Sequence, residues 1–205
     1  VRTRERTEDR ASTHSQGRRA GLTMISVIVC TYNRCESLRD TLEALQRQQV
    51  KTPGRLEIIA VDNNSSDATR AVVERAACDT QWPIRYVFEG RQGVNHARNR
   101  GVEVSGGKYV LFTDDDVLPE PGWAQAIVAA LERHDADVAG GKILPRWVEP
   151  PPAWLQDPAV RNSYSDILAI LDRGPQEIEM RGVYDGRLIF GASMGLRKSV
   201  VESMG

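Results

Sequence analysis

The stretch KYVLFTDDDVLPEPGW (108–123) joins a short apolar run to three consecutive carboxylates, Asp114, Asp115 and Asp116. The apolar part, YVLFTD (109–114), has the composition of a buried β-strand. Adjacent carboxylates repel one another by roughly 1 kcal/mol per pair in water, and by more in a half-buried cleft. A divalent cation relieves that repulsion, and the hard ions Mg²⁺ and Mn²⁺ prefer oxygen ligands. The stretch therefore predicts a strand that ends at a metal-binding acidic cluster.

The same alternation of apolar runs and amphipathic stretches continues on both sides of this stretch. Continuous apolar runs predict strands at 25–32, 56–62, 84–89, 109–114 and 136–144. Helical spacing predicts helices at 36–49, 65–77, 93–105 and 122–134. Ser65 or Ser66 is the expected N-cap of the second helix. Four or five β-α repeats predict an α/β fold with a mostly parallel central sheet flanked by helices.

The charge balance, the length of the apolar runs and the cysteine spacing exclude several classes of protein. Lys and Arg number 27 against 28 Asp and Glu, a formal charge of −1, so no nucleic-acid partner is expected. The apolar runs are shorter than the roughly 20 residues that a transmembrane helix needs, so a cytoplasmic protein without a spanning segment is expected. Cys30, Cys35 and Cys78 form no CxxC pair, which fits free thiols in a reducing compartment.

The two ends of the chain differ from its middle. Residues 1–23 are polar and lack a hydrophobic period, so we expect a disordered N-terminal extension before a domain at 24–205. Beyond Pro145 the β-α regularity fails, and RLIFGASMGLRKS (187–199) restores a strand-like run. Trp147 and Trp154 flank prolines in between, where each is expected to be either a packing anchor or a group that stacks on a ligand.

Polar clusters follow three of the expected strands. They are TYNR (31–34), DNNSSD (62–67) and TDDD (113–116). Ligands of open α/β sheets bind outside the carboxyl ends of the strands, where these clusters are expected to meet. This convergence predicts a ligand site that contains a metal.

The motifs of several other ligand classes are absent. No GxGxxG fingerprint follows the first strand, and the chain has no GxxxxGK[ST] loop. A phosphatase nucleophile would stand where Thr31, Tyr32 and Asn33 are found. A nucleotide whose phosphates are held by a metal fits these observations best. A nucleotidyltransferase is a further alternative, but CTYNRCES lacks the Gly-rich basic loop expected of one.

Four segments in this order carry a family resemblance: SVIVCTYNR, IIAVDNNSSD, GVNHARNRGVEVSGGKYVLFTDDDVLPEPGW and GASMGLRK. They resemble the family 2 glycosyltransferases, which have the GT-A fold, a Rossmann-like α/β fold. The resemblance covers residues 24–205. It implies metal-dependent transfer of a sugar from a nucleotide-diphosphate donor to an acceptor hydroxyl, usually with inversion, in polysaccharide or glycoconjugate synthesis. It also implies Mg²⁺ or Mn²⁺, a saccharide or lipid-linked acceptor, and peripheral association with the inner membrane face.

The resemblance gives the first two polar clusters roles in holding the nucleoside. Thr31, Tyr32 and Arg34 would line the base and ribose pocket, with Arg34 either paired to phosphate or solvated in its loop. Asp62 and Asn63 match a pair that is Asp-Asp in many relatives. An amide both donates and accepts hydrogen bonds, so the base contact is expected to differ, and UDP, dTDP and GDP remain alternatives.

The resemblance also gives roles to the helix motif HARN (96–99). Arg98 would be the cation beside the diphosphate, and Asn99 would be a structural hydrogen-bonding residue. His96 is expected on the helix surface rather than in catalysis.

In the acidic cluster, Asp114 and Asp115 would contribute to donor binding, with Asp114 toward the ribose. The metal is expected on Asp115 or Asp116. Bound there, it would act as a Lewis acid on the departing diphosphate.

The catalytic base of the family is expected just beyond Gly205, so the domain is expected to be truncated at its acceptor end. The remaining acidic candidates do not match the family position: Asp166, Asp172, Asp185 and Glu202. The alternative to an active enzyme is therefore a non-catalytic fragment that binds a nucleotide sugar.

Overall fold

The computed structural model describes residues 25–51, 56–78, 80–164, 167–180 and 189–204. The expected extension at 1–23 lies outside these residues, as do Asp166 and Asp185. In chain order the elements are β1 (Ile25–Thr31), α1 (Cys35–Gln46), β2 (Leu56–Asp62), α2 (Thr69–Ala76), β3 (Ile84–Phe88), α3 (Val94–Val104), β4 (Tyr109–Asp114), α4 (Trp123–Arg133), β5 (Val138–Gly140), α5 (Ala153–Gln156), α6 (Pro158–Ser163), the 3₁₀ turn η1 (Gly191–Ser193), β6 (Met194–Arg197) and α7 (Lys198–Met204).

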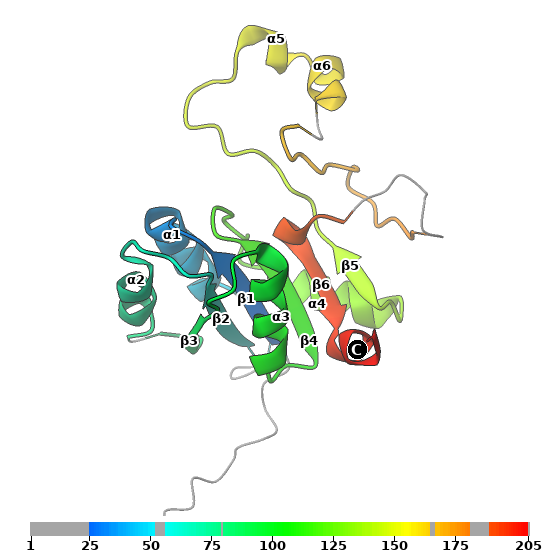
Figure 1. Ribbon diagram of the computed structural model, residues 1–205. Coiled ribbons are helices and arrows are strands. Elements are labelled where there is room, and N and C mark those ends of the chain that lie inside the picture. The colour runs from blue at the N-terminus through cyan, green and yellow to red at the C-terminus, as the bar shows by residue number, and fades with distance from the viewer. Residues whose placement is uncertain (1–24, 52–55, 79, 165–166, 181–188, 205) are drawn as a thin grey trace, which may run out of the picture.

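A six-stranded sheet in the order β3-β2-β1-β4-β6-β5 forms the centre of the molecule (Figure 1). The four strands from β3 to β4 are parallel neighbours, with Ile25 of β1 beside both Leu56 of β2 and Tyr109 of β4. The mostly parallel sheet expected from the sequence is confirmed. The predicted strands at 56–62 and 109–114 have the observed bounds.

The far edge of the sheet departs from the simple β-α repeat. β6 enters antiparallel between β4 and β5, and the strand predicted at 136–144 is only the three residues of β5. Between β5 and β6, the described residues 141–164 and 167–180 leave the sheet, and they contain no helix that packs on the sheet as a crossover (Figure 1). A parallel neighbour needs such a crossover, so the returning strand pairs in the opposite direction.

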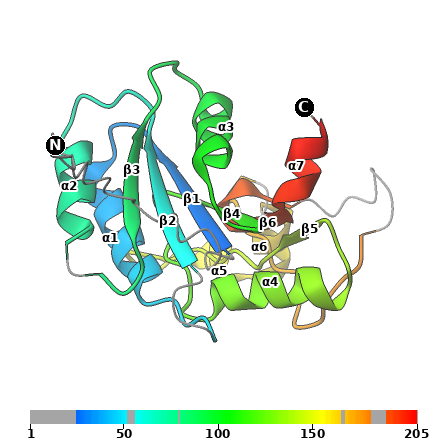
Figure 2. The ribbon, with the colours of Figure 1, turned by 90° about the horizontal axis from the view of Figure 1, so that it is seen from below.

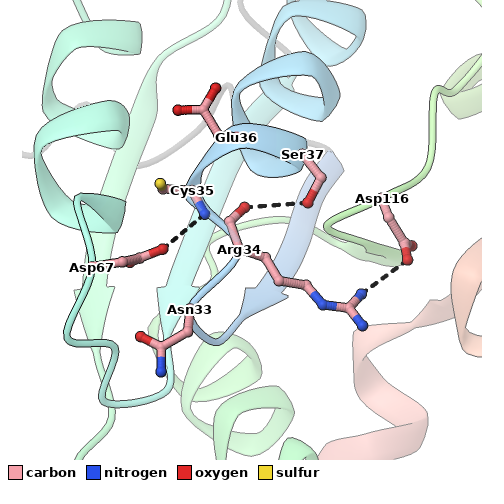
Figure 3. Close-up of a pocket in the computed structure, with 7 residues that line it drawn as sticks. All are labelled: Asn33, Arg34, Cys35, Glu36, Ser37, Asp67 and Asp116. Atoms are coloured by element: carbon pink, nitrogen blue, oxygen red, sulfur yellow. Dashed lines mark hydrogen bonds and ion pairs between the residues drawn. The ribbon is translucent and has the colours of Figure 1, made fainter.

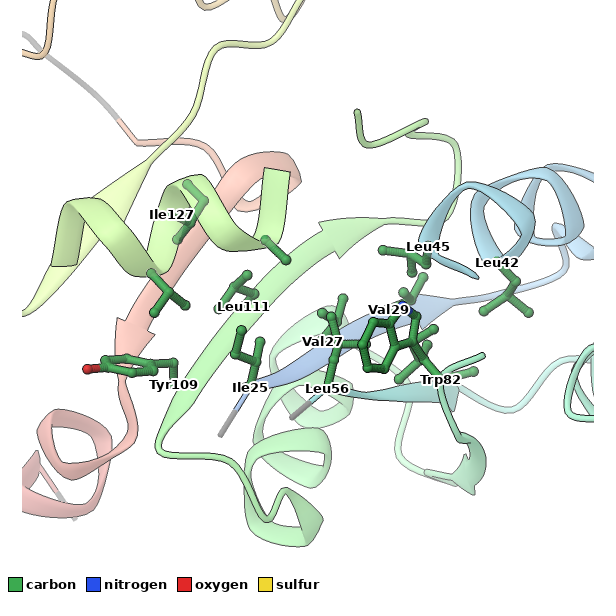
Figure 4. Packing of buried hydrophobic residues seen from close by; sticks show 14 of the residues in the cluster. Ile25, Val27, Val29, Leu42, Leu45, Leu56, Trp82, Tyr109, Leu111 and Ile127 are labelled. Atoms are coloured by element: carbon green, nitrogen blue, oxygen red, sulfur yellow. The ribbon is translucent and has the colours of Figure 1, made fainter. Parts of the chain in front are cut away.

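Helices cover both faces of the sheet (Figure 2). On one face, α1, α2 and α4 pack against the odd-numbered side chains of β1, and Figure 4 shows this core from close by. On the other face, α3 and α7 pack against Ile28 and Phe112. Leu38, Leu42 and Leu45 of α1 are fully buried because spacings of four and three residues bring them onto one side of the helix.

Two helix boundaries differ from those predicted by the sequence, because polar side chains near them bond to other parts of the chain. The prediction that Ser65 or Ser66 caps α2 is wrong, because α2 begins at Thr69 with Ala68 as its N-cap. Both serines bond to Asn33 in the loop after β1 instead. α1 ends at Gln46, ahead of the predicted 49, and the following Gln48 is fully buried and bonds to the start of α4.

The segment between β5 and β6 carries α5 and α6 away from the sheet (Figure 1). One antiparallel bridge, Ile143 with Leu171, ties its two limbs together. Within the described part of the chain, no helix is long and apolar enough to cross a membrane.

Candidate functional site

The carboxyl ends of β2, β1 and β4 lie side by side at one edge of the sheet. Thr31 at the end of β1 is in register with Asp62 at the end of β2. On its other side, Cys30 is in register with Asp114 at the end of β4. The structure therefore brings the three polar clusters together, as the parallel order of these strands requires.

The loop after β1 is bonded to the loop after β2. Asn33 has a φ of 52°, a left-handed conformation that asparagine tolerates better than most residues. Its backbone N–H donates to Ser65 Oγ at 2.9 Å, and its Oδ1 accepts from the Ser66 N–H at 2.7 Å. Asp67 Oδ2 accepts from the Cys35 N–H at 3.0 Å, at the first turn of α1 (Figure 3). These bonds fix the two loops as one unit.

An open pocket of about 490 Å³ lies at the start of α1, between these loops and the acidic cluster (Figure 3). Asp67 and Arg34 line it together with Asp116. Burial alone would raise the pKa of Asp67, but hydrogen bonds from Thr69 and Cys35 outweigh it and lower the pKa to about 2. Asp67 is therefore a permanent anion beside the pocket.

Arg34 crosses this pocket to the acidic cluster. Its Nη1 lies 3.3 Å from Asp115 Oδ1 and 2.9 Å from Asp116 Oδ2. The charges of Asp115 and then Asp116 raise the pKa of the guanidinium. The Arg34 side chain is 58% exposed, so it is free to move when another cation or an anion arrives.

Burial distinguishes the three carboxylates. Asp115 is only 5% exposed, and burial raises its pKa, while the charge of Arg34 opposes that shift. Burial also raises the pKa of Asp114, although the charge of Arg98 counteracts it. Asp116 is half exposed. The negative charge of this cluster is only partly compensated by its protein neighbours.

Arg98 extends from α3 toward Asp114, with 3.7 Å between Nη2 and Asp114 Oδ1. Its guanidinium lies over the Phe112 ring, 5.9 Å from the ring centroid. It also lies against Gly191 of η1, where an added Cβ would be 2.3 Å from Arg98 Nη2. Burial raises the pKa of the adjacent Cys30 to about 12, although Arg98 opposes that shift, so this thiol is a neutral core group.

On the β2 side of the site, Asp62 is 3% exposed and both of its oxygens have protein partners. Oδ1 accepts from the Ser65 N–H at 2.8 Å, and Oδ2 accepts from the Tyr86 hydroxyl at 2.7 Å. Burial and then this bond to the carboxylate raise the pKa of Tyr86 to about 12. Asp62 therefore organises its loop, and a carboxylate has acceptor capacity for further bonds.

Asn63 is 6% exposed and faces the loop between β3 and α3. Its amide bonds to Glu89, Arg91 and Gly93 of that loop. The donor and acceptor groups of the Asn63 amide thus all have partners within the protein.

The acidic cluster has the donor chemistry of a cation site. Asp115 and Asp116 offer carboxylate oxygens already gathered around one cationic group, Arg34. Within the described residues, no three His, Cys, Asp or Glu side chains are grouped to hold a metal by themselves. Mg²⁺ is commonly held by one or two carboxylates together with substrate phosphates. The oxygen donors of this cluster fit a hard divalent ion of that kind.

The other residues singled out in the sequence lie at the surface. Tyr32, in the loop after β1, is 48% exposed. His96 and Asn99 are exposed on α3, and the surface position expected for His96 is confirmed. Trp147 and Trp154 are exposed in the segment between β5 and β6, where Trp154 contacts Tyr164 edge-on.

Two of the acidic residues considered as a base are described, and each is ion-paired to a lysine. Asp172 Oδ1 lies 2.8 Å from Lys142 Nζ, and Glu202 Oε1 lies 3.7 Å from Lys198 Nζ. Neither belongs to the strand-end cluster.

Sequence reasoning missed two residues of the site. Tyr86 reads as an ordinary aromatic residue of β3, and its alternation with buried Val87 gives no sign of its bond to Asp62. Gly191 belongs to the quoted GASMG segment, and its contact with Arg98 connects parts of the chain that lie far apart in sequence. A small residue next to a strand is the only available signal, and it has many other causes.

Comparison with known proteins is consistent with this geometry. Residues 26–205 match the model of the family described as Glycosyl transferase family 2. The glucosyl-dolichyl phosphate glucuronosyltransferase of Haloferax volcanii is 32% identical over 136 residues, 65% of this chain and 42% of that protein. The GalNAc(5)-diNAcBac-PP-undecaprenol beta-1,3-glucosyltransferase of Campylobacter jejuni is 39% identical over 94 residues, 45% of this chain and 29% of that protein.

A solved structure has the same fold. The mannosyltransferase PcManGT of Pyrobaculum calidifontis, in complex with GDP-Man and Mn²⁺, aligns with a TM-score of 0.64 at 21% identity. The alignment covers 90% of this chain and 47% of that one. This likeness confirms the GT-A fold expected from the sequence. The chain spans about two fifths of the length of the first of these relatives.

Proposed function

The chain belongs to glycosyl transferase family 2, and we propose that it transfers a sugar from a nucleotide-diphosphate sugar to an acceptor hydroxyl with inversion. The observation that carries this proposal is the meeting of three polar strand ends, one of which is an acidic cluster faced by two arginines. A diphosphate brings negative charge that suits the arginines, and a divalent ion brings the positive charge that the carboxylates need.

In this proposal the β1 loop and Asp62 hold the nucleoside. Tyr32 is exposed in the loop after β1 and stacks on the base, while Thr31 and Asp62 lie at adjacent strand ends. Asp114 accepts from the ribose. Arg34 and Arg98 change partners from carboxylates to phosphate oxygens when the donor binds, because both are side chains that the ligand can reach.

Asp115 and Asp116 are the residues that would hold Mg²⁺ or Mn²⁺ in this proposal. Bound there, the ion would supply Lewis-acid stabilisation of the departing diphosphate. The protein's own part is to hold the Asp115 carboxyl group beside Arg34, whose charge favours the ionised form against the effect of burial on its pKa.

The transfer itself is a displacement at the anomeric carbon. The bond from the acceptor oxygen to that carbon forms as the bond to the diphosphate breaks, and a carboxylate base takes the hydroxyl proton. We assign that base to neither Asp172 nor Glu202, since each is paired to a lysine away from the strand ends.

We further propose a saccharide or lipid-linked acceptor, with the reaction at the inner face of the membrane. The support comes from the comparisons, because the names of two similar proteins include dolichyl phosphate and undecaprenol. In this proposal the protein is associated with the membrane peripherally and acts in polysaccharide or glycoconjugate synthesis.

Turnover tests the proposal directly. The chain is incubated with UDP-, dTDP- or GDP-sugars, Mn²⁺ and a panel of saccharide and undecaprenyl-diphosphate acceptors, and release of nucleoside diphosphate is measured. One donor should give acceptor-dependent release that EDTA abolishes, and Asp115→Asn should reduce it at least about 100-fold. Asp40→Asn, an exposed change on α1, is the matched control and should keep full activity.

Two other outcomes have distinct meanings. A donor that binds but is never turned over would make the chain a nucleotide-sugar-binding module without transfer activity. Absence of binding by every donor would overturn the proposal as a whole.

A further inference from the structure

The loop between β3 and α3, residues 89–93, is attached to the end of β2 chiefly through the side chain of Asn63. The Glu89 N–H also donates to the Asp62 carbonyl at 2.9 Å, and Gln92 Nε2 donates to the Asn63 carbonyl at 3.4 Å. Asn63 Nδ2 donates to the Glu89 carbonyl at 3.2 Å and to the Arg91 carbonyl at 2.7 Å. Asn63 Oδ1 accepts from the Gly93 N–H at 2.8 Å. Both amide hydrogens and the carbonyl oxygen are therefore used within the protein.

We propose that Asn63 is a positioning residue that acts through the 89–93 loop and the start of α3 on Arg98, rather than by touching the nucleotide base. This inference rests on the proposed function, because Arg98 matters through the donor diphosphate. It accounts for the amide at this position: an ionised aspartate side chain would only accept, and its carboxylate would face the carbonyl oxygens of Glu89 and Arg91.

The path from Asn63 to Arg98 is short and runs through the helix start. Gly93, held by Asn63, is the N-cap of α3 with a φ of +132°, a conformation that residues with a side chain rarely adopt. Its carbonyl accepts from the N–H groups of His96 and Ala97. Ala97 is fully buried against the sheet, and Arg98 is the next residue.

Asn63 has little room left for a direct ligand contact. Its side chain is buried, and a base edge would have to displace one of the main-chain carbonyl or N–H groups that Asn63 already bonds. The loop is braced in addition by Glu89, whose carboxylate accepts from the Arg91 N–H at 2.8 Å and pairs with the Arg91 guanidinium. The loop that Asn63 holds is thus a preorganised unit.

The first arm of the test needs no ligand. Amide hydrogen exchange is measured on wild type, Asn63→Ala and Asn63→Asp, with Asn64→Asp as the control because Asn64 is exposed and adjacent. Asn63→Ala should speed exchange of the Gly93 N–H by about 10- to 100-fold. Asn63→Asp keeps an acceptor for Gly93 but should still loosen residues 89–93. Unchanged protection of these residues in both variants would overturn the inference.

The second arm measures how the effect reaches the donor. Affinities for UDP, dTDP and GDP with Mn²⁺ are determined for Asn63→Ala in the wild-type and Arg98→Gln backgrounds. In the wild-type background, affinity should fall about 5-fold, by the same factor for every nucleotide that binds. In the Arg98→Gln background the loss should be under about 2-fold, because both changes remove the same interaction.

Two results of the binding measurements would overturn the inference. Equal losses in the two backgrounds, or a change in preference among the nucleotides, would mean that Asn63 contacts the ligand itself and would overturn the inference. If wild type binds none of the three nucleotides, the proposed function fails, whereas the exchange arm still tests the role of Asn63 in the loop.

Discussion

The two sides of the strand-end site hold their polar groups in opposite ways. On the β2 side, Asp62 and Asn63 are buried and bonded to main chain and to Tyr86, which are fixed partners. On the β4 side, the carboxylates from Asp114 to Asp116 are paired with Arg34 and Arg98, which are side chains able to leave. Fixed bonds provide shape for recognition, whereas exchangeable ion pairs can give way to a cation and a diphosphate.

This comparison predicts that changes on the β2 side act mainly on the stability of the protein and its loops, and that changes on the β4 side act mainly on binding. The largest effect is expected for Asp62→Ala, which removes the acceptors of the Ser65 N–H and the Tyr86 hydroxyl. The free energy of unfolding should fall by about 2–3 kcal/mol. Urea denaturation measures it, and Tyr86→Phe, which removes one of the two bonds, should cost about 1 kcal/mol. A loss below about 0.5 kcal/mol for Asp62→Ala would remove the distinction between the two sides.

The next largest effect is expected for Arg34→Gln. Nucleotide affinity in the presence of Mn²⁺ should fall about 10-fold, because a charge-assisted bond to phosphate is lost. Stability should change by less than about 0.5 kcal/mol, since the side chain is 58% exposed and an exposed ion pair contributes little. Calorimetry and urea denaturation measure the two quantities. Large destabilisation with unchanged affinity would reverse the comparison.

Asp115→Asn should stabilise the nucleotide-free protein at pH 7. Burial raises the pKa of Asp115 above its ordinary 3.8, so the ionised carboxylate costs stability in the folded state. That cost appears as pH rises through 3.8 and is absent below it, where the group is protonated in both states. Urea denaturation of the two proteins from pH 3 to pH 7 should therefore give a difference that grows with pH. A variant less stable than wild type at pH 7 would contradict this sign.

The smallest effect is expected for Gly191→Ala. Its new Cβ would lie 2.3 Å from Arg98 Nη2, and the guanidinium would have to move away from Asp114. Nucleotide affinity should fall about 3-fold with stability nearly unchanged, because the end of a flexible side chain is what moves. Gly122→Ala is the control, since an added Cβ there meets nothing within 4 Å. Equal affinities for the two variants would mean that Gly191 does not hold Arg98.

The sequence predicted the fold best where a continuous apolar run corresponds to a strand that is buried in the structure. β2 and β4 are continuous apolar runs, so their bounds and their polar ends could be predicted. The antiparallel direction of β6 could not be predicted. It depends on the direction from which the chain re-enters the sheet, and the residues of the strand, Met194 to Arg197, do not encode that direction.

Side-chain partners across loops were equally out of reach of the sequence. Ser65 and Ser66 have the chemistry of helix caps, and only the position of Asn33 explains why they bond to the loop after β1. The sequence did mark Asn63 as unusual, but three partners 26 to 30 residues away decide what its amide does.

The most direct test of the central claim is calorimetric binding of UDP, dTDP and GDP, each with Mn²⁺ or with EDTA. It is made on the wild-type chain and on the Asp115→Asn/Asp116→Asn double variant. We predict that at least one nucleotide binds the wild type with Mn²⁺, and that EDTA or the double substitution weakens binding at least about 100-fold. Failure of all three nucleotides to bind the wild type with Mn²⁺ would contradict the donor site at these strand ends.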